Sequence, residues 1–559
     1  MNDYRSTEES NSAPGKELII VPSDGASNIK LSAYDFFSLQ ECSVVMTETP
    51  AHRIAGVYYN DIAEELAWFK NAISNLKIIG QEKLEKKKVA VISPVARGAS
   101  GALIADKNRI LDHASGKYTL AYTQPYSDKV NQQFLDFCGD AREFFIETGS
   151  IATYPGCLTL LKRILFEEME RASLLFKAQR FIIYPLLIAG DFLGGNYLQA
   201  AQLAGNEHSY WMCHTGARNI HGSPGTLSRL CKKITSYSRL VPAESAICYR
   251  SIGVVQSTLA SKIKLSDKCS TLVTAGGHDT SFSHIPIIAS FYQQFPHMQQ
   301  KEHWHLEIGT WIMGALLGDR NSIDKSILNK LFGKGIVIQG SVDGNPIITT
   351  MYAGGADFKF LKKLVEDRGI YFGHRDPLWN FERTMVDIAK EYLECEERSC
   401  FVMPNMNPSN FGHGPFPEIR GKIINEEAFL YNGERAFVFA NLMSALITAY
   451  QLMQISPDPQ IPIVITGGGA KNPLFGQLLA TITRKDVYTI FNHQGDPLVE
   501  TTSLGAAMVG KAAVLNIHPY DVDLSVLGIS YRKSKYFNKK TLKMFIEKYQ
   551  KRYFKLLSN

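Results

Sequence analysis

Three glycine-rich turns, each directly after an apolar run, have residue types that could bind phosphate. They are Ser23-Asp24-Gly25-Ala26-Ser27-Asn28, Gly276-Gly277-His278-Asp279-Thr280 and Gly467-Gly468-Gly469-Ala470-Lys471-Asn472. A glycine turn exposes backbone N–H groups and lets a ligand approach with no Cβ in the way. A helix that starts at such a turn adds partial positive charge suited to phosphate. Taken singly, each turn is equally typical of an ordinary strand-to-helix connection.

Asp279 lies where a predicted strand gives way, through two glycines, to a predicted helix. Phosphoryl transfer to an alcohol needs a carboxylate that orients the hydroxyl and accepts its proton. An aspartate before Thr-Ser-Phe is also a good helix start, so capping is the alternative role. His278 next to it either contacts a substrate or only packs against its neighbours.

His303 and His305 form an H-x-H pattern on a predicted strand. That spacing puts both rings on one face, as metal ligands require. The sequence shows no third ligand nearby, so the pattern does not favour a zinc site.

Alternating strands and helices must position these groups. Strands are predicted at 17–22, 29–35, 88–93 and 271–275, as a pair around Gly309 within 305–318, and at 461–466. Helices are predicted at 59–77, 157–176, 357–366, 377–394, 426–453, 473–483, 500–516 and 540–557. The alternation recurs in both halves and predicts two α/β domains, with the boundary near 285–303.

Composition narrows the class of protein. A chain of 559 residues is too long for one hydrophobic core, and a net charge of +6 is too small to indicate a nucleic-acid or membrane partner. The nine cysteines include no C-x-x-C pair, which is typical of reduced thiols in a cytoplasmic protein. The apolar run at 181–190 has about half the ~20 residues that a membrane span needs. Residues 1–16 form a polar tail without a signal-peptide pattern.

Taken in order, several segments resemble the FGGY carbohydrate kinases of the sugar kinase, Hsp70 and actin superfamily, especially rhamnulokinase-like or fuculokinase-like members. The segments are GGHDT at 276–280, GTW at 309–311, YAGGADFKFL at 352–361, GGGAKNPLFGQLLATIT at 467–483, ETTSLGAAMVG at 500–510, ETGSIATYPGCLTLL at 147–161 and MCHTGARN at 212–219. The resemblance implies an α/β fold of two RNase H-like (actin/hexokinase-type) domains with an interdomain cleft. The implied divisions are a tail at 1–16, a sugar-binding domain at 17–290, an ATP-binding domain at 300–520 and a basic helical tail at 521–559.

The resemblance also implies ATP- and Mg²⁺-dependent phosphorylation of a sugar hydroxyl, with Asp279 as general base. The sugar side would comprise Arg97, Gly98, His214, Thr215, His278 and Asp279. The nucleotide side would comprise Gly25, Ser27, Asn28, Lys30, Gly309, Thr310, Gly355, Gly468, Gly469 and Asn472, and the metal ligands Asp24 and Glu307. A solvated Lys30, a buried and hydrogen-bonded His214 and a helix-capping Asn472 are open alternatives. The expected partners are a small sugar and ATP, and the family allows a homodimer.

Three positions depart from the family pattern. The family's first loop reads Asp-x-Gly, but here Ser23 holds the Asp position and Asp24 lies one residue later. A shift of one residue turns a strand side chain to the other face. Glu307 places a carboxylate where relatives usually have Ser or Thr near the triphosphate, and Arg97 stands where similar members often carry His. The departures support a second hypothesis, a pseudokinase that binds sugar or nucleotide as a regulator or scaffold. An actin- or Hsp70-like interaction protein is a third hypothesis, and it does not account for the 276–280 and 467–510 segments.

Overall fold

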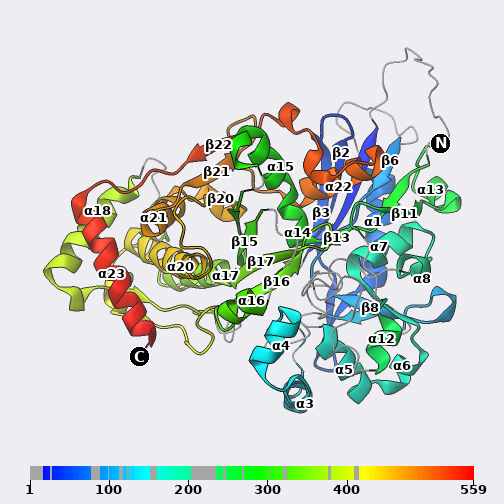
Figure 1. Ribbon diagram of the computed structural model, residues 1–559, viewed down its shortest axis with the longest axis horizontal. Helices are drawn as coiled ribbons and strands as arrows, with labels where there is room; N and C mark the ends of the chain where they lie inside the picture. The colour runs from blue at the N-terminus through cyan, green and yellow to red at the C-terminus, as the bar shows by residue number, and fades with distance from the viewer. Residues whose placement is uncertain are drawn as a thin grey trace.

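The structure is a computed structural model that describes residues 17–558, except 26–27, 77–87, 99, 112–116, 122–123, 125, 152–159, 203–234, 243–246, 267–269, 300, 319–322, 324, 375–378 and 408–413. Two mixed β-sheets organise these residues, and helices pack on both sheets (Figure 1). The predicted two-domain α/β fold is confirmed.

The first sheet has the strand order β11-β12-β6-β1-β2-β3, and β7 and β13 extend it beside β1. Its strands are β1 (Leu18–Asp24), β2 (Asn28–Asp35), β3 (Glu41–Glu48), β6 (Val89–Ile92), β7 (Val95–Ala96), β11 (Ser251–Val254), β12 (Leu272–Thr274) and β13 (Gly277–His278). β1 is antiparallel to β2 and parallel to β6. Because side chains alternate along a strand, β1 contributes Ile20 to one core cluster and Ile19 and Val21 to another. The sheet is therefore covered on both faces.

Helices and two small sheets surround the first sheet. The helices are α1 (Ile62–Asn75), α3 (Asp128–Cys138), α4 (Ala141–Thr148), α5 (Leu160–Glu170), α6 (Ala172–Lys177), α7 (Tyr184–Phe192), α8 (Tyr197–Ala200), α12 (Thr235–Leu240) and α13 (Ser257–Lys262). The small sheets pair β4 (Ala51–Ile54), β5 (Val57–Asp61) and β9 (Tyr118–Leu120), and β8 (Gly101–Ile104) with β10 (Arg180–Ile183). The helix predicted at 157–176 is described from residue 160 and breaks at Arg171, whose φ of −140° is not helical.

The second sheet has the order β16-β17-β15-β14-β20-β21-β22. Its strands are β14 (His303–Ile308), β15 (Ile312–Leu317), β16 (Ile336–Gly340), β17 (Pro346–Tyr352), β20 (Ile463–Thr466), β21 (Val487–Phe491) and β22 (Ser530–Lys533). The associated helices are α16 (Lys325–Leu331), α17 (Gly354–Glu366), α18 (Phe381–Glu394), α19 (Glu426–Phe429), α20 (Gly433–Ile455), α21 (Pro473–Thr483) and α23 (Lys540–Ser558). A short hairpin joins β18 (Phe401–Val402) to β19 (Ile423–Ile424). Strands β14 and β20 are parallel neighbours, so the turns at Gly309 and Gly467 leave the same edge of the sheet.

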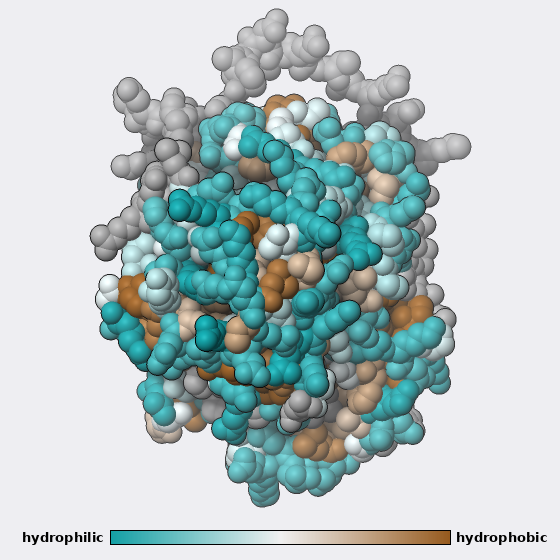
Figure 2. Space-filling view, turned by 90° about the vertical axis from the view of Figure 1, so that its left-hand side faces the viewer, coloured by the Kyte–Doolittle hydropathy of each residue, from teal (hydrophilic) through white to brown (hydrophobic). Residues whose placement is uncertain are grey.

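Residues 521–559 complete the second domain. β22 pairs with β21, and α23 packs against α18 and α21. The buried hydroxyls of Tyr549 and Tyr553 donate hydrogen bonds to the carbonyls of Cys400 and Val402, at 2.8 and 2.9 Å. The molecular face on this side is largely hydrophilic (Figure 2). The lysines of α23 therefore belong to the solvated side of a packed helix.

α20 is the central helix of the second core. Of the described residues, only this helix is long and apolar enough to cross a membrane, and 83% of its apolar window is buried inside the protein. Its side chains share a core cluster with β14, β20 and α21. Its composition is explained by burial within the domain.

Three helices connect the two sheets: α14 (Asp279–Ser283), α15 (Ile285–Gln294) and α22 (Thr502–Leu515). The boundary predicted at 285–303 begins with α15, so the chain leaves the first domain as a helix. α22 comes late in the sequence but packs on β1 and β6 of the first sheet and on α14 (Figure 1). A Cβ at Gly505 would overlap the carbonyl oxygen of Phe282, and one at Gly510 would lie 3.0 Å from Ile19 and Val91. Small residues therefore let this helix pack closely on the first sheet and on α14.

Candidate active site

Asp279 begins α14 directly after β13. Its Oδ1 accepts a hydrogen bond from the backbone N–H of Thr280 at 2.7 Å, and its side chain is 38% exposed. The Nε2 of buried His278 lies 3.1 Å from the same oxygen. Burial lowers the pKa of His278, although the nearby Asp279 carboxylate opposes that shift. Neutral His278 and the N–H of Thr280 therefore both contact Oδ1 of Asp279, and Oδ2 can face a ligand.

Asp24 lies in a buried polar group on the opposite side of β1 from Ser23. Nη1 of Arg97 is 2.8 Å from Asp24 Oδ1 and donates to the carbonyl of Gly25 at 2.5 Å. Nη2 of Arg97 is 3.6 Å from Glu65 of α1, and the guanidinium lies over the ring of Tyr184 of α7 at 5.0 Å. Two carboxylates thus share one guanidinium.

Burial raises the pKa of Asp24, Arg97 lowers it, and Asp279 raises it further. Burial likewise raises the pKa of Glu65 well above its usual value, and the adjacent Asp24 adds to the shift. A lone buried cation does not offset two buried carboxylates, so this group holds a proton near neutral pH. The Oδ2 of Asp24 is buried and accepts no hydrogen bond from the described residues.

Ser23 occupies the other face of β1, where the first phosphate loop was predicted. It pairs across the antiparallel register with Lys30 of β2. Lys30 Nζ lies 2.6 Å from Oε2 of Glu500, which precedes α22. Lys30 therefore forms an ion pair with Glu500 between the first sheet and α22. The sequence did not predict this partner, although Glu500 lies in the 500–510 segment that resembles the family.

Glu307, near the end of β14, lies close enough to Asp279 for the two carboxyl groups to interact electrostatically. Burial raises the pKa of Glu307 to about 7, and the charges of Asp279 and Glu500 add to the rise, while a hydrogen bond with Ser283 opposes it. The carboxylates of Asp279 in α14 and of Glu500 just before α22 therefore act on the carboxyl of Glu307 in β14. Oxygen donors of this kind are the ligands that Mg²⁺ prefers.

The predicted phosphate turns of the second domain converge. A Cβ at Gly355 would overlap the carbonyl of Gly309, and one at Gly469 would overlap the side chain of Ile308. Gly467 has φ +78°, and a Cβ there would lie 2.7 Å from the carbonyl oxygen of Ile308. The backbone N–H of Ala356 donates to the carbonyl of Thr310 at 3.0 Å. Glycine is required here because the end of β14, the start of α17 and the Gly467 turn meet backbone to backbone.

Asn472 is the N-cap of α21, where its Oδ1 accepts from the N–H of Leu474 at 3.2 Å. Its Nδ2 also donates to Oδ1 of Asn441 in α20, at 2.6 Å. The capping alternative thus describes its contacts within the protein.

The remaining predicted residues are spread over the first domain and the turn. Gly98 follows β7, Asn28 begins β2, and Gly468 begins the 3₁₀ turn after Gly467. Ser27, His214 and Thr215 lie outside the described residues. Glu65 and Tyr184 were not predicted, since an acid within an amphipathic helix and a tyrosine before Pro185 carry no distinguishing pattern.

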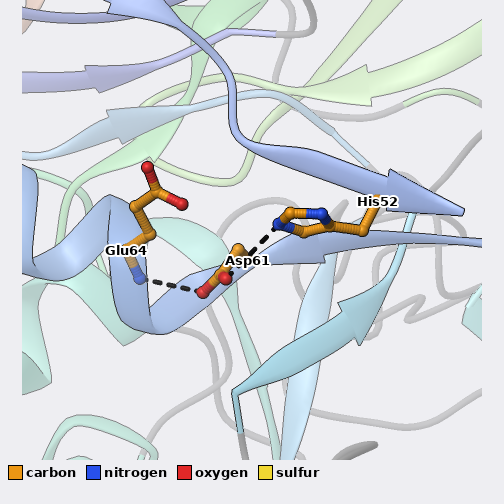
Figure 3. Close-up of side chains that lie close together, drawn as sticks. All are labelled: His52, Asp61 and Glu64. Carbon is orange, nitrogen blue, oxygen red and sulfur yellow. Dashed lines mark hydrogen bonds and ion pairs between the residues drawn. The ribbon is translucent and has the colours of Figure 1, made fainter. Parts of the chain in front are cut away.

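A second group of potential metal ligands lies where β4, β5 and the start of α1 meet in the first domain. His52, Asp61 and Glu64 are the one such group among the described residues (Figure 3). Nε2 of His52 is 3.5 Å from Asp61 Oδ2, and Asp61 Oδ1 accepts the N–H of Glu64 at 2.9 Å as the N-cap of α1. Helix capping accounts for this arrangement.

Comparisons with known proteins show which proteins share this fold. Residues 306–517 match the model of the C-terminal domain of carbohydrate kinases of the FGGY type. Comparison with curated protein sequences gives no significant match. Over the whole chain, the structure is similar to a carbohydrate kinase from Novosphingobium aromaticivorans, with 17% identity, a TM-score of 0.71 and coverage of 98% of this chain and 99% of that one.

Two further structures are equally informative about the fold. A ligand-bound xylulose kinase from Lactobacillus acidophilus has 16% identity and a TM-score of 0.71, with coverage of 97% of both chains. The Plasmodium falciparum glycerol kinase with ADP has 14% identity and a TM-score of 0.69, with coverage of 97% and 98%. The chain therefore has the two-domain fold of these carbohydrate kinases throughout, and residues 306–517 are similar to the C-terminal domain of the FGGY type.

Proposed function

We propose that this protein is an ATP-dependent carbohydrate kinase in which Asp279 accepts the proton of the sugar hydroxyl. The observation that carries the proposal is the position of Asp279. Its partly exposed carboxylate starts the helix α14, and its charge acts on Glu307 at the end of β14, the strand that leads into the Gly309 turn. General bases of this kind act on a hydroxyl held in line with a γ-phosphate.

The nucleotide is proposed to bind at the converging turns of the second domain. Glycine at positions 355, 467 and 469 lets the Gly309 turn, the start of α17 and the Gly467 turn pack closely, so that a phosphate placed there would meet main-chain atoms of three turns. The start of α17 adds partial positive charge. ATP is also the phosphate donor expected from the fold.

Mg²⁺ fits a donor set at the ends of β14 and β1. Glu307 would hold the ion together with Oδ2 of Asp24, which accepts no hydrogen bond from the described residues, and Asp279 would remain the base. The bound ion would offset phosphate charge. A bound cation would favour the deprotonated form of Glu307 beside ATP, because burial raises the pKa of Glu307 to about 7.

The substrate is proposed to be a ketose. The resemblance of the 309–311 and 352–361 segments favours six-carbon deoxyketoses such as rhamnulose or fuculose. The test is ADP release with ATP and Mg²⁺ against rhamnulose, fuculose, xylulose, glycerol and an aldonate. Release with one sugar supports the proposal, and its absence with all of them contradicts it.

The matched variants in this assay are Asp279→Asn and Asp140→Asn. Both positions stand at helix starts, but Asp140 caps α4 in the first domain by accepting the N–H of Glu143 at 2.9 Å. Only the Asp279 variant should lose turnover. Equal rates in the two variants would exclude Asp279 as the base.

A second function is favoured by one specific observation. Arg97 occupies Oδ1 of Asp24, and Ser23 stands where the family has its first-loop aspartate. If phosphate transfer requires a carboxylate at position 23, this protein would bind nucleotide without transferring phosphate. Such a protein would show an ADP-induced rise in melting temperature and no turnover with any sugar.

A further inference from the structure

One face of β14 meets the helix pair α14–α15 through a row of polar side chains. His303, His305 and Glu307 alternate along the strand and therefore point to the same side. The ring of His303 stacks on Phe291 at 4.8 Å, and Glu307 lies near Ser283 of α14. Between them, Nδ1 of His305 is 2.7 Å from Nδ1 of His284. The H-x-H pattern thus serves an interface between a strand and a helix.

His305 uses its second ring nitrogen as well. Its Nε2 lies 2.6 Å from Oγ1 of Thr466, the last residue of β20. Thr466 immediately precedes Gly467, and His284 follows Asp279 by five positions in the sequence. One imidazole therefore joins the helix that begins at the proposed base to the strand that carries the proposed nucleotide turn.

The direction of the hydrogen bonds follows from burial. His284, His305 and Thr466 are each at most 1% exposed, and Nε2 of His284 contacts no hydrogen-bond partner among the described residues. Because the two Nδ1 atoms lie 2.7 Å apart, one of them carries the proton and the other accepts it. A buried N–H without an acceptor costs more than an unused lone pair. His284 Nδ1–H therefore donates to His305 Nδ1, and His305 Nε2–H donates to Thr466 Oγ1.

We propose that His305 is a positioning residue, which fixes the distance between the base at the start of α14 and the nucleotide turn after β20 through the chain His284–His305–Thr466. This inference rests on the proposed kinase function. All three side chains are buried, so they would act on catalysis through the alignment of base and phosphate and not through contact with the substrate. Removing either end should therefore lower kcat and leave the KM for the sugar nearly unchanged.

The experiment compares Thr466→Val with Thr349→Val. Each change removes one buried hydroxyl from the second sheet, and Thr349 of β17 donates to Gln339 Oε1 at 3.3 Å, away from the chain of three residues. We expect Thr466→Val to lower kcat by about fivefold, while Thr349→Val stays within about twofold of wild type. Equal effects of the two variants would overturn the proposal.

A double mutant tests whether the residues act as one unit. His284→Leu should lower kcat about as much as Thr466→Val, and the double variant should be no slower than the slower single one. His284→Asn keeps a donor near the position of Nδ1 and should restore most of the rate. Multiplying losses in the double variant, or no recovery with Asn, would show that the side chains contribute only separate packing. If His284→Leu does not fold, the two Thr→Val variants decide the matter.

ADP affinity separates failure of this inference from failure of the proposed function. If the wild type phosphorylates no sugar, the kinase assignment fails, but calorimetric titration with ADP still probes the Thr466 end. We then expect Thr466→Val to bind ADP about fivefold more weakly than Thr349→Val. Equal ADP affinities would overturn the positioning role, whatever the catalytic activity of the wild type.

Discussion

At the scale of single residues, the position of the aspartate in β1 determines which face of the strand carries its carboxylate. Because side chains alternate along β1, Ser23 and Asp24 point to opposite faces, and Asp24 joins Arg97 and Glu65 in a buried group. The sequence predicted that Asp24 and Ser23 would point to opposite faces of the strand. It could not predict Glu65, because α1 brings that residue to Arg97 from more than thirty positions away in the sequence.

Asp279→Asn is expected to keep ADP binding and lose most sugar-dependent turnover. The amide retains the size of the side chain and can accept the N–H of Thr280, but it cannot take up a proton. Loss of a general base typically costs about 10²- to 10⁴-fold in rate. Turnover and the ADP-induced shift in melting temperature measure the two properties separately, and an unchanged rate would contradict the assignment.

Ser23→Asp is expected to increase Mg²⁺-dependent turnover, or to create it if the wild type is inactive. The new carboxylate would lie on the face of β1 beside Lys30 and opposite Asp24. Titration of turnover against Mg²⁺ concentration measures the change, and Ser32→Asp is unsuitable as a control because Ser32 is buried. Ser23→Asn is the matched control, since it adds a similar volume without charge. An equal response to both variants would show that charge at this position is irrelevant.

Glu307→Gln is expected to stabilise the free protein above neutral pH. Burial raises the pKa of Glu307 from 4.5 to about 7, so the folded state binds the proton more tightly than the unfolded state. The free energy of unfolding therefore falls as pH rises from about 4.5 through about 7. The variant lacks this fall, and the difference between variant and wild type should change by about 1–3 kcal/mol across the window.

Urea denaturation at pH 5 and pH 8 without metal measures this difference for Glu307→Gln. The exposed Glu547 of α23 supplies the control, because Glu547→Gln removes a carboxylate whose side chain is 65% exposed. A difference that does not depend on pH at position 307 would mean that the carboxyl titrates normally.

At the scale of elements, strand and helix positions followed well from periodicity, but two predicted helices are each divided in the structure. The helix predicted at 426–453 is the pair α19 and α20, separated by residues 430–432. The predictions for β20, α21 and α22 agree with the structure because their apolar runs are long and end at Gly, Pro or Asn. The pattern at 157–176 predicted one helix, but the chain turns at Arg171 between α5 and α6. Hydrophobic periodicity continues across that break, so it could not reveal it. Nor could periodicity show that His303 and His305 face α15.

Gly505→Ala is expected to destabilise the protein more than Gly510→Ala. A Cβ at position 505 would overlap the backbone carbonyl of Phe282, whereas a Cβ at position 510 would meet side-chain atoms at 3.0 Å or more. Backbone cannot yield as side chains do, so Gly505→Ala should cost about 1–3 kcal/mol, typical of overpacking. Chemical denaturation gives both values, and a larger loss at position 510 would contradict this account of α22.

At the scale of the whole molecule, the two domains share structure instead of being joined by a linker. The chain leaves the first domain through α14 and α15, and α22 returns from the second domain to pack on the first sheet. The sequence predicted the domain count and the fold class. The predicted domains were continuous segments of the chain. The sequence could not show that residues 502–515 complete the first domain's core, because that depends on a contact between distant segments.

Calorimetry should therefore show one cooperative unfolding transition for the free protein. Unfolding of the second domain would remove α22 from the first sheet and expose Ile19, Val21 and Val91. ADP, bound at the turns of the second domain, should raise the temperature of that single transition. Two separate transitions, with only one shifted by ADP, would show that the domains are thermodynamically independent.

The packing of α22 has a consequence for biosynthesis. A ribosome releases residues 17–290 long before residues 502–515, yet one face of the first sheet needs those late residues to cover Ile19, Val21 and Val91. The nascent first domain must therefore wait, with apolar surface exposed, while about two hundred further residues are made, an interval of about 10–40 s at ordinary elongation rates. Chaperone demand should be greatest in that interval, and synonymous codons that slow translation between residues 300 and 500 should lower the yield of folded protein.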